Sequence, residues 1–113
     1  MTVAAYVPDL MDRSRISAAA GSGGVKVVFV SGLDKVPSDA ELVVVDLARP
    51  GAVDGLAGLD GRRSVGFASH VDRDLIKRAK AAGCDEVLAR SVFFSRLGRI
   101  LVPHADESGA EGS

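Results

Sequence analysis

The chain has 113 residues, a formal net charge of −1 and 47% apolar residues. This length suits one domain, and the apolar share excludes a globally disordered chain. The near-zero net charge gives no reason to expect nucleic-acid binding. The single cysteine, Cys84, excludes an internal disulfide and any metal site built from paired cysteines.

No apolar run approaches the roughly 20 residues that a helix needs to cross a bilayer. The N-terminus also lacks the basic-then-apolar order of a signal peptide. We therefore expect a cytoplasmic protein without membrane contact. We expect one folded domain over residues 1–103 and, because the sequence from Pro103 is small and polar, a disordered tail over 104–113.

The first predicted strand covers residues 3–7, and Pro8 ends it because proline cannot donate to a central ladder. Asp9 is placed to cap a helix that begins near Leu10. The four residues 21–24, three of them glycine, end this helix. The chain is therefore predicted to begin with a strand, followed by a helix that the glycine-rich segment ends.

The second strand is predicted over 25–30 and the third over 41–46. The segment between them, 31–40, has room for a single helical turn at most. After the third strand, residues 52–59 predict a short helix weakened by two internal glycines. The second and third helices are thus expected to be shortened.

The fourth strand is predicted over 64–68 and the fifth over 86–89. Between them, residues 70–82 show the strongest helical pattern, with Val71 on its apolar stripe. Ser91 is predicted to cap a last helix with apolar residues on one face.

Alternating strands and helices predict an α/β fold with right-handed crossovers. For five strands, the expected architecture is a three-layer α/β/α sandwich around a parallel sheet of flavodoxin-like order 2-1-3-4-5. The run Val43–Val45 has no polar alternation, as in strands buried on both faces. Asp46 follows it directly, at the edge where such sheets bind ligands.

Three segments in this order resemble response-regulator receiver (CheY-like) domains, over roughly residues 3–102. The segment Val44–Gly55 is similar to the receiver pattern of an apolar run, the phosphoacceptor Asp, Leu, Pro and a later Asp-Gly. Ala68-Ser69-His70 is similar to the Thr-Ala-His turn, and Ala82–Ser91 looks like the Ala-Gly-Ala-Asp-Asp-Tyr-Leu-x-Lys-Pro segment.

The resemblance implies a phosphoacceptor at Asp46 and an Mg²⁺ ion held by two acids after the first strand together with Asp46. Only Asp9 remains of those two acids, because the other position is Pro8. The position of the phosphoryl-binding hydroxyl is Ala68, with Ser69 beside it. The position of the phosphoryl-binding lysine is Arg90, and that of the aromatic switch is Val87.

These losses predict a degenerate receiver, or pseudo-receiver. One lost carboxylate weakens Mg²⁺ binding, and a guanidinium at Arg90 is expected to pair with Asp46 in the pocket. We therefore expect no cofactor and no catalysis. The expected function is a stand-alone module for signalling or regulation that acts by phosphorylation-independent protein contact or dimerisation.

The partner, or a second copy, is expected to bind the surface of helix four, strand five and helix five, through Val92, Phe94, Arg96 and Arg99. Thin helical cover around strands two and three suggests a second binding or dimerisation face. A monomer without an exposed apolar patch there would remove this suggestion.

Two other functions remain open. The first is a functional phosphoacceptor of a two-component system, with Mg²⁺ held by Asp9 and Asp46 and possible help from Asp12. The second is a module that binds a small ligand in the crevice at the strand ends. Structural roles compete with both: Asp46 as a strand-end cap, Asp9 as a helix cap and Cys84 as a small buried residue.

Overall fold

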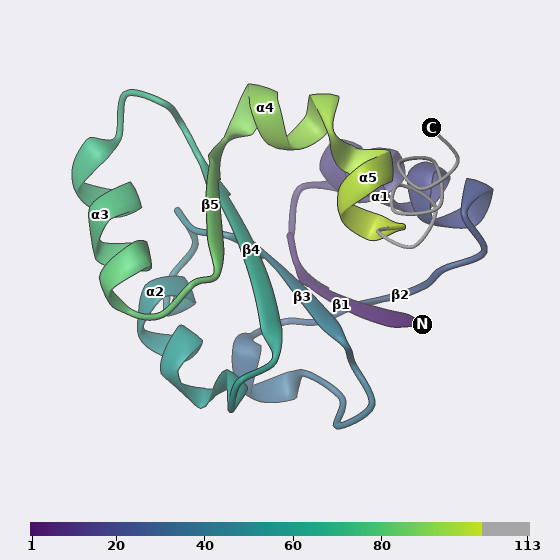
Figure 1. Ribbon diagram of the computed structural model, residues 1–113, viewed down its shortest axis with the longest axis horizontal. Coiled ribbons are helices and arrows are strands. Elements are labelled where there is room, and N and C mark those ends of the chain that lie inside the picture. The colour runs from purple at the N-terminus through teal and green to yellow at the C-terminus, as the bar shows by residue number, and fades with distance from the viewer. Residues whose placement is uncertain (103–113) are drawn as a thin grey trace, which may run out of the picture.

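The computed structural model describes residues 1–102, which form a parallel five-stranded sheet between two layers of helices (Figure 1). The strand order is β2-β1-β3-β4-β5, so the predicted flavodoxin-like order is confirmed. The strands are β1 (Thr2–Tyr6), β2 (Lys26–Phe29), β3 (Leu42–Asp46), β4 (Arg63–Ala68) and β5 (Glu86–Ala89). The predicted boundary at 103 and the predicted tail 104–113 lie outside the described residues.

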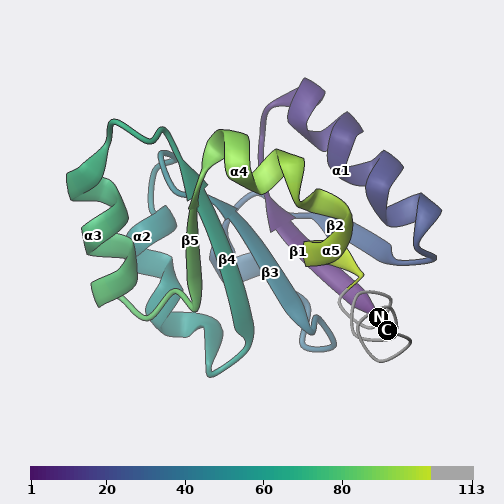
Figure 2. The same ribbon diagram turned by 45° about the horizontal axis from the view of Figure 1, so that its top comes forward.

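The helical segments are α1 (Leu10–Ser22), η1 (Leu33–Lys35), α2 (Ala52–Gly55), η2 (Leu56–Leu59), α3 (Arg73–Ala81), α4 (Arg90–Ser95) and α5 (Leu97–Leu101). Figure 2 shows α1, α4 and α5 over one face of the sheet and α2 and α3 over the other. The shortened second and third helices are confirmed, since η1 is one turn and α2 has four residues. Within residues 1–102, no helix has the length and apolar character to span a membrane.

The strand β3 lies at the centre of the sheet, and all five of its residues are buried. Val44 faces the core under α1, α4 and α5, whereas Val43 and Val45 face the core under α2 and α3. Burial on both faces explains why this strand has no polar alternation.

The cover over β2 and β3 differs from the prediction. β3 is wholly buried, whereas β2 is an edge strand with three half-buried residues. Val43 and Val45 of β3 are covered by residues of η1, α2 and η2, and Val30 and Ala40 of the segment between β2 and β3 pack against Ala4 of β1. The large apolar side chains exposed within residues 1–102 are Met1, Leu10, Met11 and Val71. The suggested binding face over β2 and β3 therefore has no exposed apolar patch to support it.

The helix α3 begins later than predicted. Asp72 is its N-cap, and its carboxylate accepts a hydrogen bond from the backbone N–H of Leu75. The preceding residues form a turn closed by the Asp72 N–H and the Ser69 carbonyl. Val71 therefore lies before the helix and is 73% exposed, so its predicted place on the apolar stripe is wrong.

The last helix is divided into two segments. α4 begins at Arg90, and its N-cap is Ala89 without a side-chain bond, so the predicted cap at Ser91 is wrong. Arg96 leaves the helical conformation, with φ −108° and ψ 12°, and separates α4 from α5. The bend lets α5 pack on α1 while α4 stays at the ends of β4 and β5.

Candidate functional site

The register of the sheet brings the candidate residues to one edge. Asp46 lies opposite Phe67 of β4, and Ala68 lies opposite Ala89, the residue before Arg90. These strand ends and the loops after them enclose a cavity of about 230 Å³. Its lining residues are Asp46, Ala48, Arg49, Phe67, Ala68, Ser69 and Arg90. We call this cavity the Asp46 pocket; it contains four of the five residues predicted for it from the sequence.

Asp46 is only 7% exposed, and its carboxylate is bound by the loop that follows it. It accepts a hydrogen bond from the Ala48 N–H at 3.2 Å. Its other oxygen accepts the Nε–H of Arg49 at 3.1 Å and forms an ion pair with it. Asp46 therefore acts as a cap at the end of β3, and its negative charge is compensated within three residues.

Arg90 has a different partner from the one predicted. Its guanidinium donates to the carboxylate of Asp12 in α1 and forms an ion pair with it. This hydrogen bond raises the pKa of Arg90 above its ordinary value, and the charges of Asp12, Asp46 and Asp9 act in the same direction. The predicted salt bridge between Arg90 and Asp46 is wrong, although both residues line one cavity.

Burial explains this choice of partner. Asp12 is only 2% exposed, and a carboxylate with so little water requires a positive charge or donors nearby. Asp12, Ile16 and Ala20 are the buried residues of α1, at spacings of four. The sequence therefore carried a signal for Asp12, because its position continues the inward stripe of the helix. The charge of Asp46 is compensated without Arg90, because Arg49, three residues later in the chain, forms an ion pair with it.

The segment before α1 holds one of the two acids that the resemblance assigns to an Mg²⁺ site, as the sequence indicated. Pro8 has no carboxylate. Asp9 is the N-cap of α1 and accepts a hydrogen bond from the Asp12 N–H at 2.9 Å, which is the structural role considered for it from the sequence. Among residues 1–102, no group of three or more His, Cys, Asp or Glu side chains is placed to hold a metal ion. In this arrangement the carboxylates of Asp46 and Asp12 are each bound by a guanidinium, of Arg49 and Arg90 respectively.

The predicted partner surface on the last helix loses its aromatic residue. Phe94 is 8% exposed and packs edge-to-face against Phe67 and Phe93, with centroid distances of 5.4 and 4.9 Å. The guanidinium of Arg15 lies 4.1 Å from its centroid. Phe94 is thus part of the core, and its predicted place on an exposed surface is wrong. Of the other three residues predicted for this partner surface, Arg96 and Arg99 are exposed and Val92 is half-buried.

Cys84 is buried, as expected, and its thiol donates to the Glu86 carbonyl at 3.3 Å. Burial is the main cause that raises the pKa of the Cys84 thiol above its ordinary 9.0. The stability that this provides is present below pH 9.0 and lost as the pH rises further, because the unfolded chain ionises first. We expect slow alkylation of Cys84 at neutral pH and fast alkylation in denaturant, measured by mass. Equal rates would contradict this burial.

No protein-family profile and no curated protein sequence matches the chain. Solved structures do match it. A response regulator from Hahella chejuensis has a TM-score of 0.75 at 19% identity, over 88% of this chain and 91% of that one. A response regulator receiver protein from Pseudoalteromonas atlantica has a TM-score of 0.74 at 12% identity, over 96% and 99%. The chain has the receiver fold.

The receiver fold also occurs in the phosphorylated cyanobacterial phytochrome response regulator RcpA, with a TM-score of 0.70 at 17% identity, over 91% of this chain and 89% of that one. The fold that the three motifs predicted through their resemblance to receiver domains is therefore confirmed. Within this receiver-fold domain, the acidic and basic residues at the strand ends pair with each other, as Asp46 with Arg49 and Asp12 with Arg90.

Proposed function

We propose that this receiver-fold domain acts in signalling or regulation through protein contact, without phosphoryl transfer to Asp46. The observation that carries the proposal is that Asp46 and Arg90, the acceptor and the cation expected to bind a phosphoryl group, both have partners in the chain. Asp46 is bound by Arg49, and Arg90 is bound by Asp12. A phosphoryl group would have to replace the first contact and attract Arg90 away from the second.

The cost of this replacement supports the proposal. Phosphoryl transfer depends on positioning and on charges that stabilise the transferring group. Arg90 would leave a buried carboxylate, Asp12, without its cation, and this is costly because the side chain is only 3% exposed. Ala68 has no hydroxyl that could bind the phosphoryl group and offset this cost. Ser69 has one, but it is exposed and lies one residue beyond the end of β4.

The pairing of these acids with arginines supports a function that does not require Mg²⁺. Arg49 and Arg90 supply the positive charge that a bound cation would otherwise supply beside Asp46 and Asp12. Such a domain needs neither metal nor phosphodonor to keep its pocket neutralised. Its effect on a pathway then requires a protein partner or a second copy. The surface for that contact is formed by α3, β5 and the divided last helix, α4 and α5, where Arg96, Arg99 and part of Val92 are accessible.

Intact-mass measurement tests the proposal. The full chain is incubated with acetyl phosphate and Mg²⁺, with an Asp46→Asn variant as the matched control. We expect no mass gain in either protein. A mass gain of one phosphoryl group in the wild-type chain that is absent from Asp46→Asn would overturn the proposal.

A phosphoacceptor at Asp46 is the second candidate function, and two observations favour it. Asp46 borders a cavity of about 230 Å³ at the strand ends, and the phosphorylated regulator RcpA shares the fold. In this case Arg49 would swing out, and Asp9 and Asp46 would hold Mg²⁺. A phosphoryl gain in the wild-type chain, increased by Arg49→Ala, would favour this candidate.

A further inference from the structure

Positive charge gathers on the helical layer of α1, α4 and α5. Two stretches of the sequence, residues 13–33 and 87–102, contain no Asp or Glu, and they include α4, α5, β2 and most of α1. The one acid within the three helices is Asp12, which is buried and bound by Arg90. This layer is therefore basic, although the whole chain has a net charge of only −1. The basic residues of the two stretches are Arg13, Arg15, Lys26, Arg90, Arg96 and Arg99.

A groove of about 400 Å³ opens on this layer, between α1 and α4. The guanidiniums of Arg15 and Arg90 lie 4.1 and 5.0 Å from the centre of the Phe94 ring, so the ring holds both in place. Arg90 also binds Asp12, whereas Arg15 forms no ion pair with any residue of the described range 1–102. We call this cavity the α1–α4 groove. Its lining residues are Arg15, Arg90, Ser91, Phe94 and Ser95.

The residues that follow Val102 have the opposite charge. Residues 103–113 contain three acids, Asp106, Glu107 and Glu111, and no Lys or Arg. Their starting point is fixed, because the side chain of Val102 fills the space that a Cβ on Gly23 would occupy. Gly23 is the C-cap of α1. The acidic segment therefore begins on the basic layer, at the C-terminal end of α1.

The segment is long enough to reach the α1–α4 groove. Arg15 lies eight residues before Gly23, which is about 12 Å along a helix that rises 1.5 Å per residue. About four extended residues span this distance at roughly 3.3 Å each. Residues 103–113 therefore suffice for a turn at the end of α5 and for the path back to Arg15.

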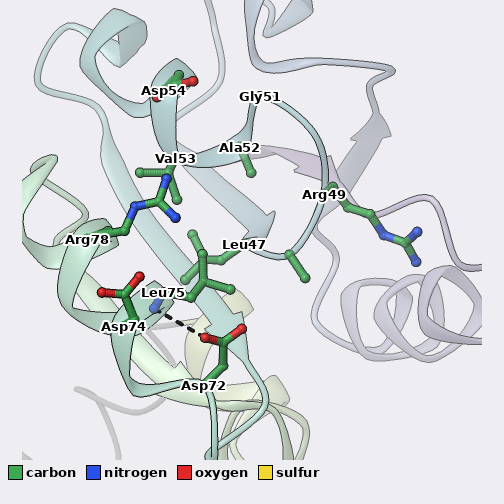
Figure 3. A pocket seen from close by; sticks show the side chains of 11 residues that line it. Leu47, Arg49, Gly51, Ala52, Val53, Asp54, Asp72, Asp74, Leu75 and Arg78 are labelled. Atoms are coloured by element: carbon green, nitrogen blue, oxygen red, sulfur yellow. Dashed lines mark hydrogen bonds between the residues drawn. The ribbon is translucent and has the colours of Figure 1, made fainter.

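The opposite helical layer is unsuited to the same segment. A groove of about 290 Å³ between the loop after β3 and α3 is bordered by three acids, Asp54, Asp72 and Asp74, beside Arg78 (Figure 3). Like charges repel an acidic segment at such short range. Charge therefore directs the segment to the α1–α4 groove.

We propose that the acidic segment 103–113 of this chain binds the α1–α4 groove, with its carboxylates paired to Arg15 and the neighbouring arginines. A guanidinium can bind a carboxylate through two parallel hydrogen bonds. Each exposed pair is weak, but a short tether gives the segment an effective concentration of about millimolar, so several weak pairs populate the contact. The inference goes beyond the proposed function and does not depend on it, because no partner and no phosphoryl group takes part.

Amide NMR of the isotope-labelled full chain tests the proposal with a variant whose segment carries no negative side chain: Asp106→Asn, Glu107→Gln and Glu111→Gln together. At low salt, we expect its amide shifts to differ from those of the wild-type chain over residues 12–19 and 90–99. These differences should fall at least about fivefold in 1 M NaCl, where the Debye length is about 3 Å. They should not change with protein concentration, because the contact forms within one chain.

A matched variant neutralises three exposed acids elsewhere, through Asp39→Asn, Asp54→Asn and Asp60→Asn. It changes the net charge equally and should leave the amides of residues 12–19 and 90–99 unshifted. Arg15→Gln should shift the amides of residues 104–111 in the wild-type chain but not in the variant with the neutral segment.

Three results would overturn the proposal. The first is that the neutral segment leaves the amides of the α1–α4 groove unshifted. The second is that the matched variant shifts them as much. The third is that the shifts grow with protein concentration, which would assign the bound segment to a second copy.

Discussion

Replacing Phe94 by alanine should lower the free energy of unfolding by about 3 kcal/mol, as for other buried phenylalanines. The ring is 8% exposed and contacts two other rings edge-to-face, so its removal leaves a void beside Phe67 and Phe93. For a domain of this size, the midpoint of thermal unfolding should fall by about 15 °C. Circular dichroism during heating and urea titration measures both quantities.

Arg96→Ala is the matched control, because this exposed residue lies two positions later, between α4 and α5. Its effect should stay within about 0.5 kcal/mol. If Phe94→Ala were as mild as the control, the ring would belong to an exposed surface, and the partner surface first predicted from the sequence would regain its central residue.

Arg90→Ala is expected to have the second-largest effect, a loss of about 2 kcal/mol. Breaking a fully buried ion pair costs about 3 to 5 kcal/mol, and the half-exposed Arg90 side chain reduces this value. The loss comes from Asp12, which remains buried without its cation. The cation–π contacts of Arg90 to Phe67 and Phe94, at 5.5 and 5.0 Å, are lost as well.

A double-mutant cycle isolates the pair. Asp12→Asn removes the charge that Arg90 compensates, so Arg90→Ala should cost about 1 kcal/mol less in the Asp12→Asn background. Urea unfolding of the four proteins measures this coupling. Strictly additive changes would show that Asp12 and Arg90 do not interact in solution. Asp12 would then not keep Arg90 from binding a phosphoryl group.

The fold could be predicted from the sequence because local signals agreed with each other. The continuous apolar run of β3, the Asp9 cap and the glycines after α1 each specify one element, and short connections leave few ways to join them. The element ends were less certain. The turn closed by the Asp72 N–H and the Ser69 carbonyl places Val71 before the helix, where it is exposed, and the apolar spacing in the sequence did not reveal this turn.

The candidate site could be predicted only in part. The expected parallel order of the strands predicted that Asp46, Ala68 and Arg90 would share one edge of the sheet, and the observed register confirms it. Which charges would pair was a different question, because two arginines of the pocket, Arg49 and Arg90, could each have paired with Asp46. The burial of Asp12 decided it. Phe94 was misplaced for a related reason, since the pattern of α4 did not show that two adjacent rings could both pack around Phe67.

In the function proposed for this domain, Arg49 keeps Asp46, and Asp12 keeps Arg90, from binding a phosphoryl group. Amide NMR of the full chain with Mg²⁺ and beryllofluoride tests it most directly, because this mimic reports the bound state without a chemical step. We predict no saturable shifts around Asp46, Ser69 and Arg90 in the wild-type chain. Saturable shifts at these positions that disappear in Asp46→Asn would contradict the claim.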